Sequence, residues 1–251
     1  MPVTILDAWD QEDDYGQNGA TFAVSAGSRR CAIVFVGAES NQGSALGVSG
    51  VTLGGQAMTV QTQDTVGSTS AYHNYGGIWT LPESGISAMS GSTITVTWSN
   101  FTGQGPFSSS PAVQYASYQD VDQGNINASG TGENTNTSAG NISPASTINV
   151  AADEKVVVLF VAGQQRTPTE TSGGLTEEAE YIGTTNDMVL SAYHRTATTA
   201  DASYTGTVTI TGSNTRLQTR GFALGFDGGA AGWQPYWSPR MTQRIIGSGV
   251  R

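Results

Sequence analysis

The sequence predicts an all-β protein: an antiparallel two-sheet sandwich of the jelly-roll type, followed by an extended C-terminal arm. The chain has 251 residues, of which 33 are glycine and only 12% are charged, a composition that favours many short strands joined by turns. No stretch keeps apolar residues at i, i+3, i+4 and i+7 for three helical turns. We therefore expect residues 1–227 to form the sandwich domain and residues 228–251 to form the arm.

Strand candidates follow one another at short spacing in both halves of the chain. We expect strands at 3–9, 21–25, 31–38, 50–53, 57–62, 77–81, 93–98 and 112–119, and again at 147–150, 156–162, 178–182, 188–193, 205–211 and 218–226. The runs CAIVFV and VVVLFV are apolar throughout and should be central strands covered on both faces. The one segment that suits a short helix is TEEAEY at 176–181.

The two halves resemble each other weakly. CAIVFVG (31–37) matches VVVLFVA (156–162), ITVTWS (94–99) matches VTITGS (208–213), and YASY (115–118) matches ALGF (223–226), in the same order. This order suggests two halves built alike, such as two Greek-key halves of one sandwich. The polar segment 125–146 between them is expected to be a surface loop, and 99–111 a second one.

Cysteine content and apolar runs limit the environment of the protein. Cys31 is the single cysteine and lies in an apolar run, where a buried small hydrophobe is the expected role. The N-terminus lacks the basic and apolar regions of a signal peptide, and no apolar run is long enough to span a membrane. The four N-x-S/T sites, at Asn100, Asn127, Asn136 and Asn141, are therefore interpreted as turn chemistry.

Standard catalytic signatures are absent from the sequence. His73 and His194 both follow Ala-Tyr, and two histidines without a cysteine partner are a poor zinc site. Several acidic residues could be assembled into a glycoside hydrolase pair, but their spacing fixes no separation across a cleft; they are Glu177, Glu178, Glu180 and Asp187. We predict no catalytic residues, no metal site and no cofactor.

Two acidic segments resemble cation sites without matching one. Asp10, Glu12, Asp13 and Asp14 alternate like calcium ligands, but Tyr15 and Thr21 occupy the places where an EF-hand needs glycine and glutamate. A solvated loop is the expected structure there, with an irregular calcium site as the alternative. Asp120 and Asp122 are interpreted as a charge pair that protects a sheet edge, and a cation site is again the alternative.

The C-terminal arm differs in charge from the rest of the chain. Residues 228–251 hold Arg240, Arg244 and Arg251 and no acidic residue, so removing their charge from the total of −10 leaves −13 for residues 1–227. The arm also carries Trp233, Pro235, Tyr236, Trp237 and Pro239. Burial of its three aromatic rings alone does not offset the entropy of ordering the segment, so we expect backbone contacts as well. The eight arm residues named here are the predicted partner-binding residues, and a strap on the chain's own domain is the alternative.

The order of several phrases resembles a β-sandwich module that recurs in phage virion proteins and in secreted bacterial proteins. These phrases include GVTLGGQAMT, YGGIWTLPESG, STITVTWS, AVQYASYQDVDQG and RGFALGF, and the resemblance covers roughly residues 30–226. It implies a non-enzymatic protein with no shared catalytic residues. Secreted relatives begin with a signal peptide. Since we find no signal peptide here, we expect a protein of the phage group rather than of the secreted group.

We therefore expect a structural protein of a phage particle, a capsid decoration or head-fibre protein that is made in the host cytoplasm and docks through its arm. Its expected partners are other virion subunits, with homo-oligomerisation, and an acidic body argues against nucleic acid. No membrane partner is expected. The alternative is a carbohydrate-binding adhesin or receptor-binding tail component, with Tyr72, Tyr75 and Trp79 stacking on sugar rings. An enzyme is the third hypothesis.

Overall fold

The computed structural model confirms the all-β antiparallel sandwich. It describes residues 2–12, 19–40, 47–67, 73–99, 111–124, 126, 131–136, 148–163, 169–170, 174–182, 188–204, 208–209 and 217–225. The first half contains β1 (Thr4–Glu12), β2 (Cys31–Ser40), β3 (Gly47–Leu53), β4 (Gln56–Ala57), β5 (Thr59–Gly67), β6 (His73–Pro82), α1 (Glu83–Ser87), β7 (Ile94–Ser99) and β8 (Ala112–Gln119). The second half contains β9 (Thr131–Asn136), β10 (Ile148–Val150), β11 (Lys155–Gly163), β12 (Thr169–Glu170), β13 (Thr176–Ile182), β14 (Met188–Thr196), β15 (Asp201–Tyr204), β16 (Val208–Thr209) and β17 (Leu217–Leu224).

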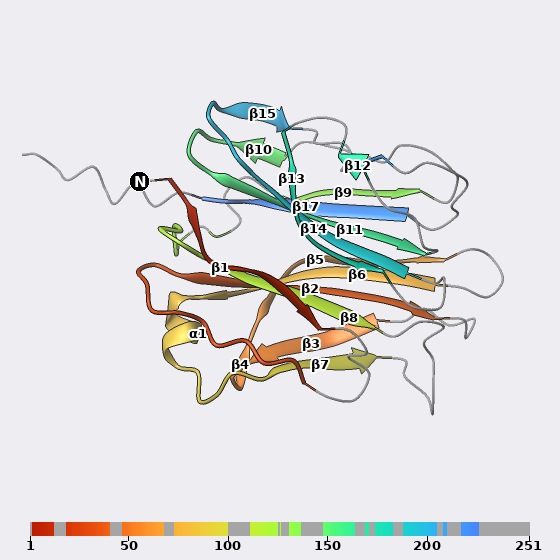
Figure 1. Ribbon diagram of the computed structural model, residues 1–251, viewed down its shortest axis with the longest axis horizontal. Helices are drawn as coiled ribbons and strands as arrows, with labels where there is room; N and C mark the ends of the chain where they lie inside the picture. Colours follow the sequence, from red (N-terminus) through yellow and green to blue (C-terminus); the bar gives the residue numbers. More distant parts are fainter. Residues whose placement is uncertain are drawn as a thin grey trace, which may run out of the picture.

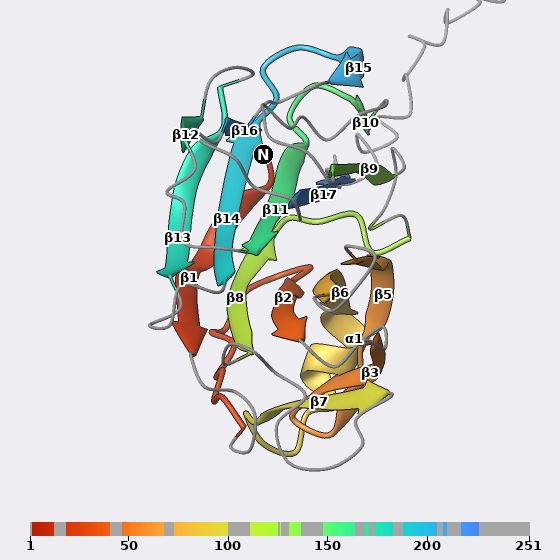
Figure 2. The same ribbon diagram turned by 90° about the vertical axis from the view of Figure 1, so that its right-hand side faces the viewer.

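Two five-stranded sheets pack face to face at the centre of the molecule. The first central sheet has the order β1-β8-β2-β6-β5, and the second has the order β13-β14-β11-β17-β9. A smaller sheet, β4-β3-β7, covers the outer face of the first, and the strand pairs β10-β15 and β12-β16 cover the outer face of the second (Figures 1 and 2). The molecule therefore has four layers and three apolar cores, where the sequence predicted a sandwich of two sheets.

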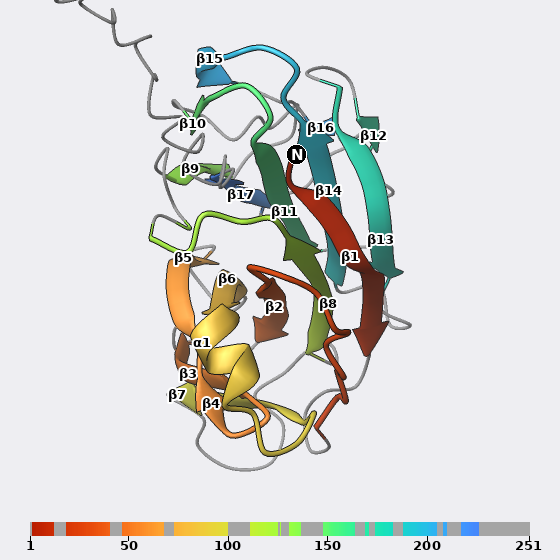
Figure 3. The same ribbon diagram turned by 90° about the vertical axis from the view of Figure 1, so that its left-hand side faces the viewer.

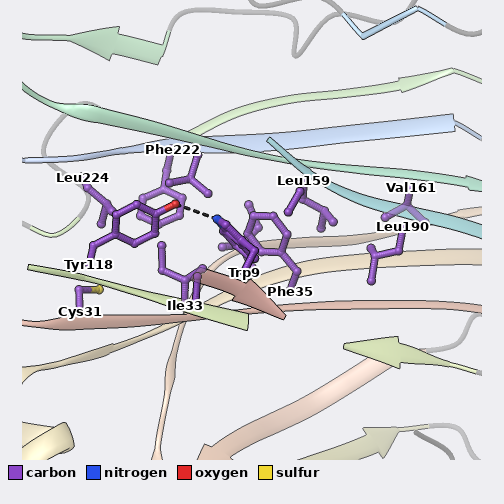
Figure 4. Packing of buried hydrophobic residues seen from close by; sticks show 14 of the residues in the cluster. Trp9, Cys31, Ile33, Phe35, Tyr118, Leu159, Val161, Leu190, Phe222 and Leu224 are labelled. Atoms are coloured by element: carbon purple, nitrogen blue, oxygen red, sulfur yellow. Dashed lines mark hydrogen bonds between the residues drawn. The ribbon is translucent and has the colours of Figure 1, made fainter. Parts of the chain in front are cut away.

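The central core joins the two halves of the chain. Ile33 and Phe35 of β2 face Leu159 of β11, Leu190 of β14 and Phe222 of β17 (Figure 4). Along the two edges of this core β1 lies over β13, which Figure 3 shows, and β5 lies over β9. Because β2 and β11 contribute apolar side chains to an outer core on their other face, the prediction that they are central and covered on both sides is confirmed.

The halves share one topology. Read from the opposite end, the second central sheet has the order β9-β17-β11-β14-β13, which matches β1-β8-β2-β6-β5 strand for strand. The outer pair β3-β7 corresponds to β12-β16. In the first half β3 lies between β2 and β5 along the sequence and β7 lies between β6 and β8. In the second half β12 and β16 lie between the equivalent strands. The isolated bridge between Thr21 and Thr93 corresponds to β10-β15. All three sequence matches between the halves begin on equivalent strands, which agrees with the predicted internal relation.

The residue-by-residue match of the two central strands is wrong by one position. It aligns Ile33, which faces the central core, with Val158, which faces the outer core of the second half. Successive strand residues point to opposite faces, so an offset that is wrong by one exchanges the two faces. The residues that share an outward direction with Val158 are Val34 and Val36.

Three other expectations about elements are wrong. Residues 176–181 lie in β13, which confirms the predicted strand at 178–182 and not the short helix that this segment also suited. The single helical turn of the described chain is α1, which follows Pro82. Residues 21–25 form only the bridge at Thr21. The expected loop 125–146 contains β9, which pairs with β17 along the edge of the second central sheet.

A two-residue hairpin connects β3 and β4. Gly54 and Gly55 have φ angles of 56° and 79°, which are the left-handed values that a type I′ turn requires at both positions. A Cβ atom on Gly54 would also lie 2.4 Å from the carbonyl oxygen of Gly91. Glycine is therefore needed at this position both for conformation and for space.

Candidate functional site

A chain of hydrogen bonds crosses the central interface at one end. The Trp9 indole Nε1 donates to the Tyr118 hydroxyl over 2.9 Å (Figure 4), and that hydroxyl lies 3.3 Å from Nδ1 of His194. On the other side of the imidazole, Nε2 lies 3.0 Å from a carboxylate oxygen of Glu178. Trp9 and Tyr118 belong to the first half, and His194 and Glu178 belong to the second, so the chain links the halves.

A neutral His194 gives each polar group in this series of hydrogen bonds a partner. With its proton on Nε2, the imidazole donates to Glu178 and accepts from Tyr118 through Nδ1. Burial, and then the positive charge of Lys155, lower the pKa of His194 to about 4. Burial likewise raises the pKa of Glu178, which Lys155 opposes, and the Lys155 ammonium donates to Thr196 Oγ1 over 2.8 Å.

Access decides what this cluster can do chemically. Tyr118 is fully buried and Trp9 nearly so, and burial raises the pKa of the Tyr118 hydroxyl above its ordinary value. Because the Tyr118 hydroxyl is not accessible to solvent, a substrate cannot contact it. Burial also disfavours its deprotonated form. The Tyr118–His194–Glu178 cluster is therefore a polar clasp between the halves, and its geometry gives no support to nucleophilic or acid–base catalysis.

A second polar cluster crosses the interface between the halves, from β17 to β5. The fully buried guanidinium of Arg220 donates to Thr62 Oγ1 over 2.8 Å and lies 3.4 Å from a carboxylate oxygen of Asp64. Arg220 is on β17 and the other two residues are on β5. The cross-half contact of the first cluster runs from β8 to β14, and that of the second runs from β17 to β5. Because β17 corresponds to β8, the same central strand of each half supplies one partner of such a contact.

The predicted docking residues lie outside the described part of the chain. This applies to all eight of them: Trp233, Pro235, Tyr236, Trp237, Pro239, Arg240, Arg244 and Arg251. Their role stays a prediction. The described surface itself exposes few large apolar side chains, of which Val60 and Ile182 are the most exposed at 39% and 40%.

Two of the three aromatic residues considered for sugar stacking are buried. Tyr75 and Trp79 pack in the outer core of the first half, where Tyr75 donates to Gln63 over 2.7 Å. Tyr72 lies outside the described residues. Tyr75 and Trp79 are therefore not available to stack on a sugar ring.

The acidic segments differ from their expected structures. Asp10 and Glu12 belong to β1 rather than to a loop, and Asp13 and Asp14 lie outside the described residues. Asp120 is buried at a φ of 62° and pairs with Arg29 over 2.6 Å, so it is no edge charge. The expectation of an edge-protecting pair at Asp120 and Asp122 is wrong.

The remaining candidates fall on different faces of the second central sheet. Glu178 turns inward to His194, while Glu177 and Glu180 face outward with Tyr193 and Ser191. Asp187 lies outside the described residues, and His73 begins β6. No group of three His, Cys, Asp or Glu side chains suited to a metal ion occurs among the residues that the structure describes.

Sequence reasoning missed both polar clusters because each is assembled from residues more than 70 positions apart. The one available signal was a polar residue within an otherwise apolar strand, such as Arg220 in LQTRGFAL. Within the described ranges, no helix has the length and apolar character needed to cross a membrane. No protein-family model, no curated protein and no solved structure matches this chain.

Proposed function

We propose that this chain is a non-enzymatic structural protein of a phage particle, a capsid decoration or head-fibre protein that docks through residues 228–251. The observation that carries the proposal is the contrast between the arm, with three arginines and no acid, and a body at −13. Opposite charges favour contact between the arm of one subunit and carboxylates of another. Trp233, Tyr236 and Trp237 supply the apolar anchors that such an interface needs.

The described body supports this division of roles. Its apolar side chains are used in three internal cores, and its most exposed large apolar residues, Val60 and Ile182, lie on different central sheets. A large contiguous apolar patch on a soluble protein marks an interaction site, and these two side chains do not form one. The sequence of the arm adds three large aromatic residues to those of the three described cores, and we assign the apolar part of the interface to them.

Deletion of residues 228–251 tests the proposal. We expect the shortened protein to fold, with an unchanged circular dichroism spectrum, and to be absent from purified particles. Replacement of Trp233, Tyr236 and Trp237 by alanine should give the same loss, and replacement of Arg240 and Arg244 by glutamine should weaken incorporation and reduce its salt dependence. Normal incorporation of the shortened protein would overturn the proposal.

A glycan array separates this function from the adhesin alternative. The structure removes Tyr75 and Trp79 from the list of candidate sugar-binding residues because both are buried. Micromolar binding of the shortened protein to one class of sugar would favour the adhesin, whereas no binding together with loss of incorporation would favour the structural role.

A further inference from the structure

A β-bulge brings two carboxylates to the same face of an edge strand. Glu177 pairs with Tyr193 and Glu180 pairs with Ser191, with a register shift between Glu177 and Ala179. In a regular strand, residues three apart point to opposite faces. The extra residue at the bulge, Glu178, turns inward to His194, so Glu177 and Glu180 both face outward. Bulges often re-aim side chains in this way next to binding sites.

The site formed by Glu177, Glu180 and Ser191 holds an excess of oxygen acceptors. One carboxylate oxygen of Glu180 is buried and makes no hydrogen bond within the described residues. The Ser191 side chain is fully buried directly opposite Glu180, and its hydroxyl has no partner of full hydrogen-bond geometry. This hydroxyl lies close enough to Glu177 to lower the pKa of that carboxyl. Glu177 has one long contact, 3.5 Å from the Tyr193 hydroxyl.

No positive side chain of the described chain forms an ion pair with these two carboxylates. The positive charge of Lys155 lowers the pKa of Glu178, which lies on the inner face of the sheet. The Arg195 guanidinium stacks over the ring of Tyr204. Burial, and next the charge of Glu180, raise the pKa of Glu177, and the Tyr193 and Ser191 hydroxyls oppose this rise only in part. Burial raises the pKa of Glu180. Two carboxylates in this setting repel each other and lack a counter-charge.

We propose that Glu177, Glu180 and Ser191 bind a hard divalent cation, Ca²⁺. Two carboxylates and a hydroxyl supply oxygen ligands of the kind that Ca²⁺ prefers, and water completes a shell of six to eight oxygens. Glu177 is exposed, which gives an ion access from solvent. The bound ion would fasten β13 to β14 at the bulge. The proposal is independent of the docking function proposed above.

Thermal unfolding of the full chain in CaCl₂ tests the site. The protein is first treated with a chelator and dialysed, and its Tm is measured in 10 mM CaCl₂ and in NaCl of equal ionic strength. We expect Ca²⁺ to raise the Tm of the wild-type protein by about 2–4 °C. Glu180→Gln should abolish the rise, and Ser191→Ala should reduce it. Asp153→Asn, at an exposed carboxylate in the turn before β11, is the control and should keep the full rise.

The competing occupant is a proton shared by the two carboxylates. In that case the wild-type Tm, relative to that of Glu180→Gln, would rise between pH 7 and pH 5, and CaCl₂ would have no effect at either pH. That result would overturn the proposal, as would an equal response to Ca²⁺ in wild-type protein and in Glu180→Gln. Calorimetric titration with CaCl₂ gives a second readout, in which one site should be lost in Glu180→Gln.

Discussion

The hydroxyl of Tyr118 lies 3.3 Å from Nδ1 of His194 and joins the first half of the molecule to the second. The same hydroxyl accepts a hydrogen bond from Trp9, so one buried oxygen satisfies two other polar groups. A group that connects partners in this way is hard to replace, since its loss leaves both partners unsatisfied in an apolar core.

Tyr118→Phe should therefore destabilise the protein by about 1–3 kcal/mol, because it removes a fully buried hydroxyl and leaves Trp9 Nε1 and His194 Nδ1 without a partner. Urea unfolding measures this loss. Tyr115→Phe on the same strand is the control, since that hydroxyl is at 3.5 Å from Asp10 and should contribute less. Equal losses in the two variants would contradict the clasp.

The clasp should also make stability depend on pH through His194. Its pKa falls from 6.5 to about 4 in the folded protein, so between these values the unfolded chain binds a proton that the folded chain does not. Stability should therefore decrease as the pH falls from 6.5 to 4. The raised pKa values of Glu177, Glu178 and Glu180 act in the opposite direction.

Comparison with His194→Gln separates the two contributions. Urea unfolding at pH 7, 5.5 and 4.5 should show a smaller loss on acidification in the variant than in the wild-type protein. The same pH dependence in both proteins would mean that His194 is not held neutral.

A second pH effect should come from the contact between Arg30 and Glu83. Arg30 donates to Glu83 through its Nε over 3.0 Å and through its backbone N–H over 2.7 Å. These bonds lower the pKa of Glu83 to about 2. Its contribution is present above pH 4.5 and is lost as the pH falls toward 2. Because both side chains are partly exposed, solvent screening limits it to about 1 kcal/mol. Glu83→Gln should lose that stability at pH 7, with the difference from wild type vanishing near pH 2.

Gly221→Ala tests how closely β11 and β10 approach β17. A Cβ atom at this position would lie 2.9 Å from the carbonyl oxygen of Val157 and 3.0 Å from Ile148 Cδ1. Since a paired strand backbone cannot move freely, we expect a loss of about 1–3 kcal/mol. Gly50→Ala, where no atom lies within 4 Å of the added Cβ, is the control and should be close to neutral.

The sequence predicts the fold class well because composition and apolar runs report directly on strands. The central runs CAIVFV and VVVLFV also contain the evidence for outer layers, since a strand that is apolar on both faces needs cover on both. Because both runs are apolar throughout, no polar position shows which alternate residues face the central core. This is why the match between Ile33 and Val158 is wrong by one.

The polar elements are predictable only in part. β9, with the sequence TGENTN, reads as a loop because an edge strand is held by backbone pairing to β17 and needs few apolar residues. α1 is too short to show a helical period. The bulge at Glu178 and the contact of Tyr118 with His194 depend on tertiary register, which no local pattern encodes.

The shared central core has a consequence for synthesis of the chain. The face of the first half that carries Ile33 and Phe35 is covered by residues as late as Phe222 and Leu224. As the polypeptide leaves the ribosome, this surface stays open to water until the chain has been made as far as residue 224. A nascent chain that stalls between β8 and β9 would expose the apolar face of the first central sheet. Conditions that slow translation in this region should therefore increase aggregation.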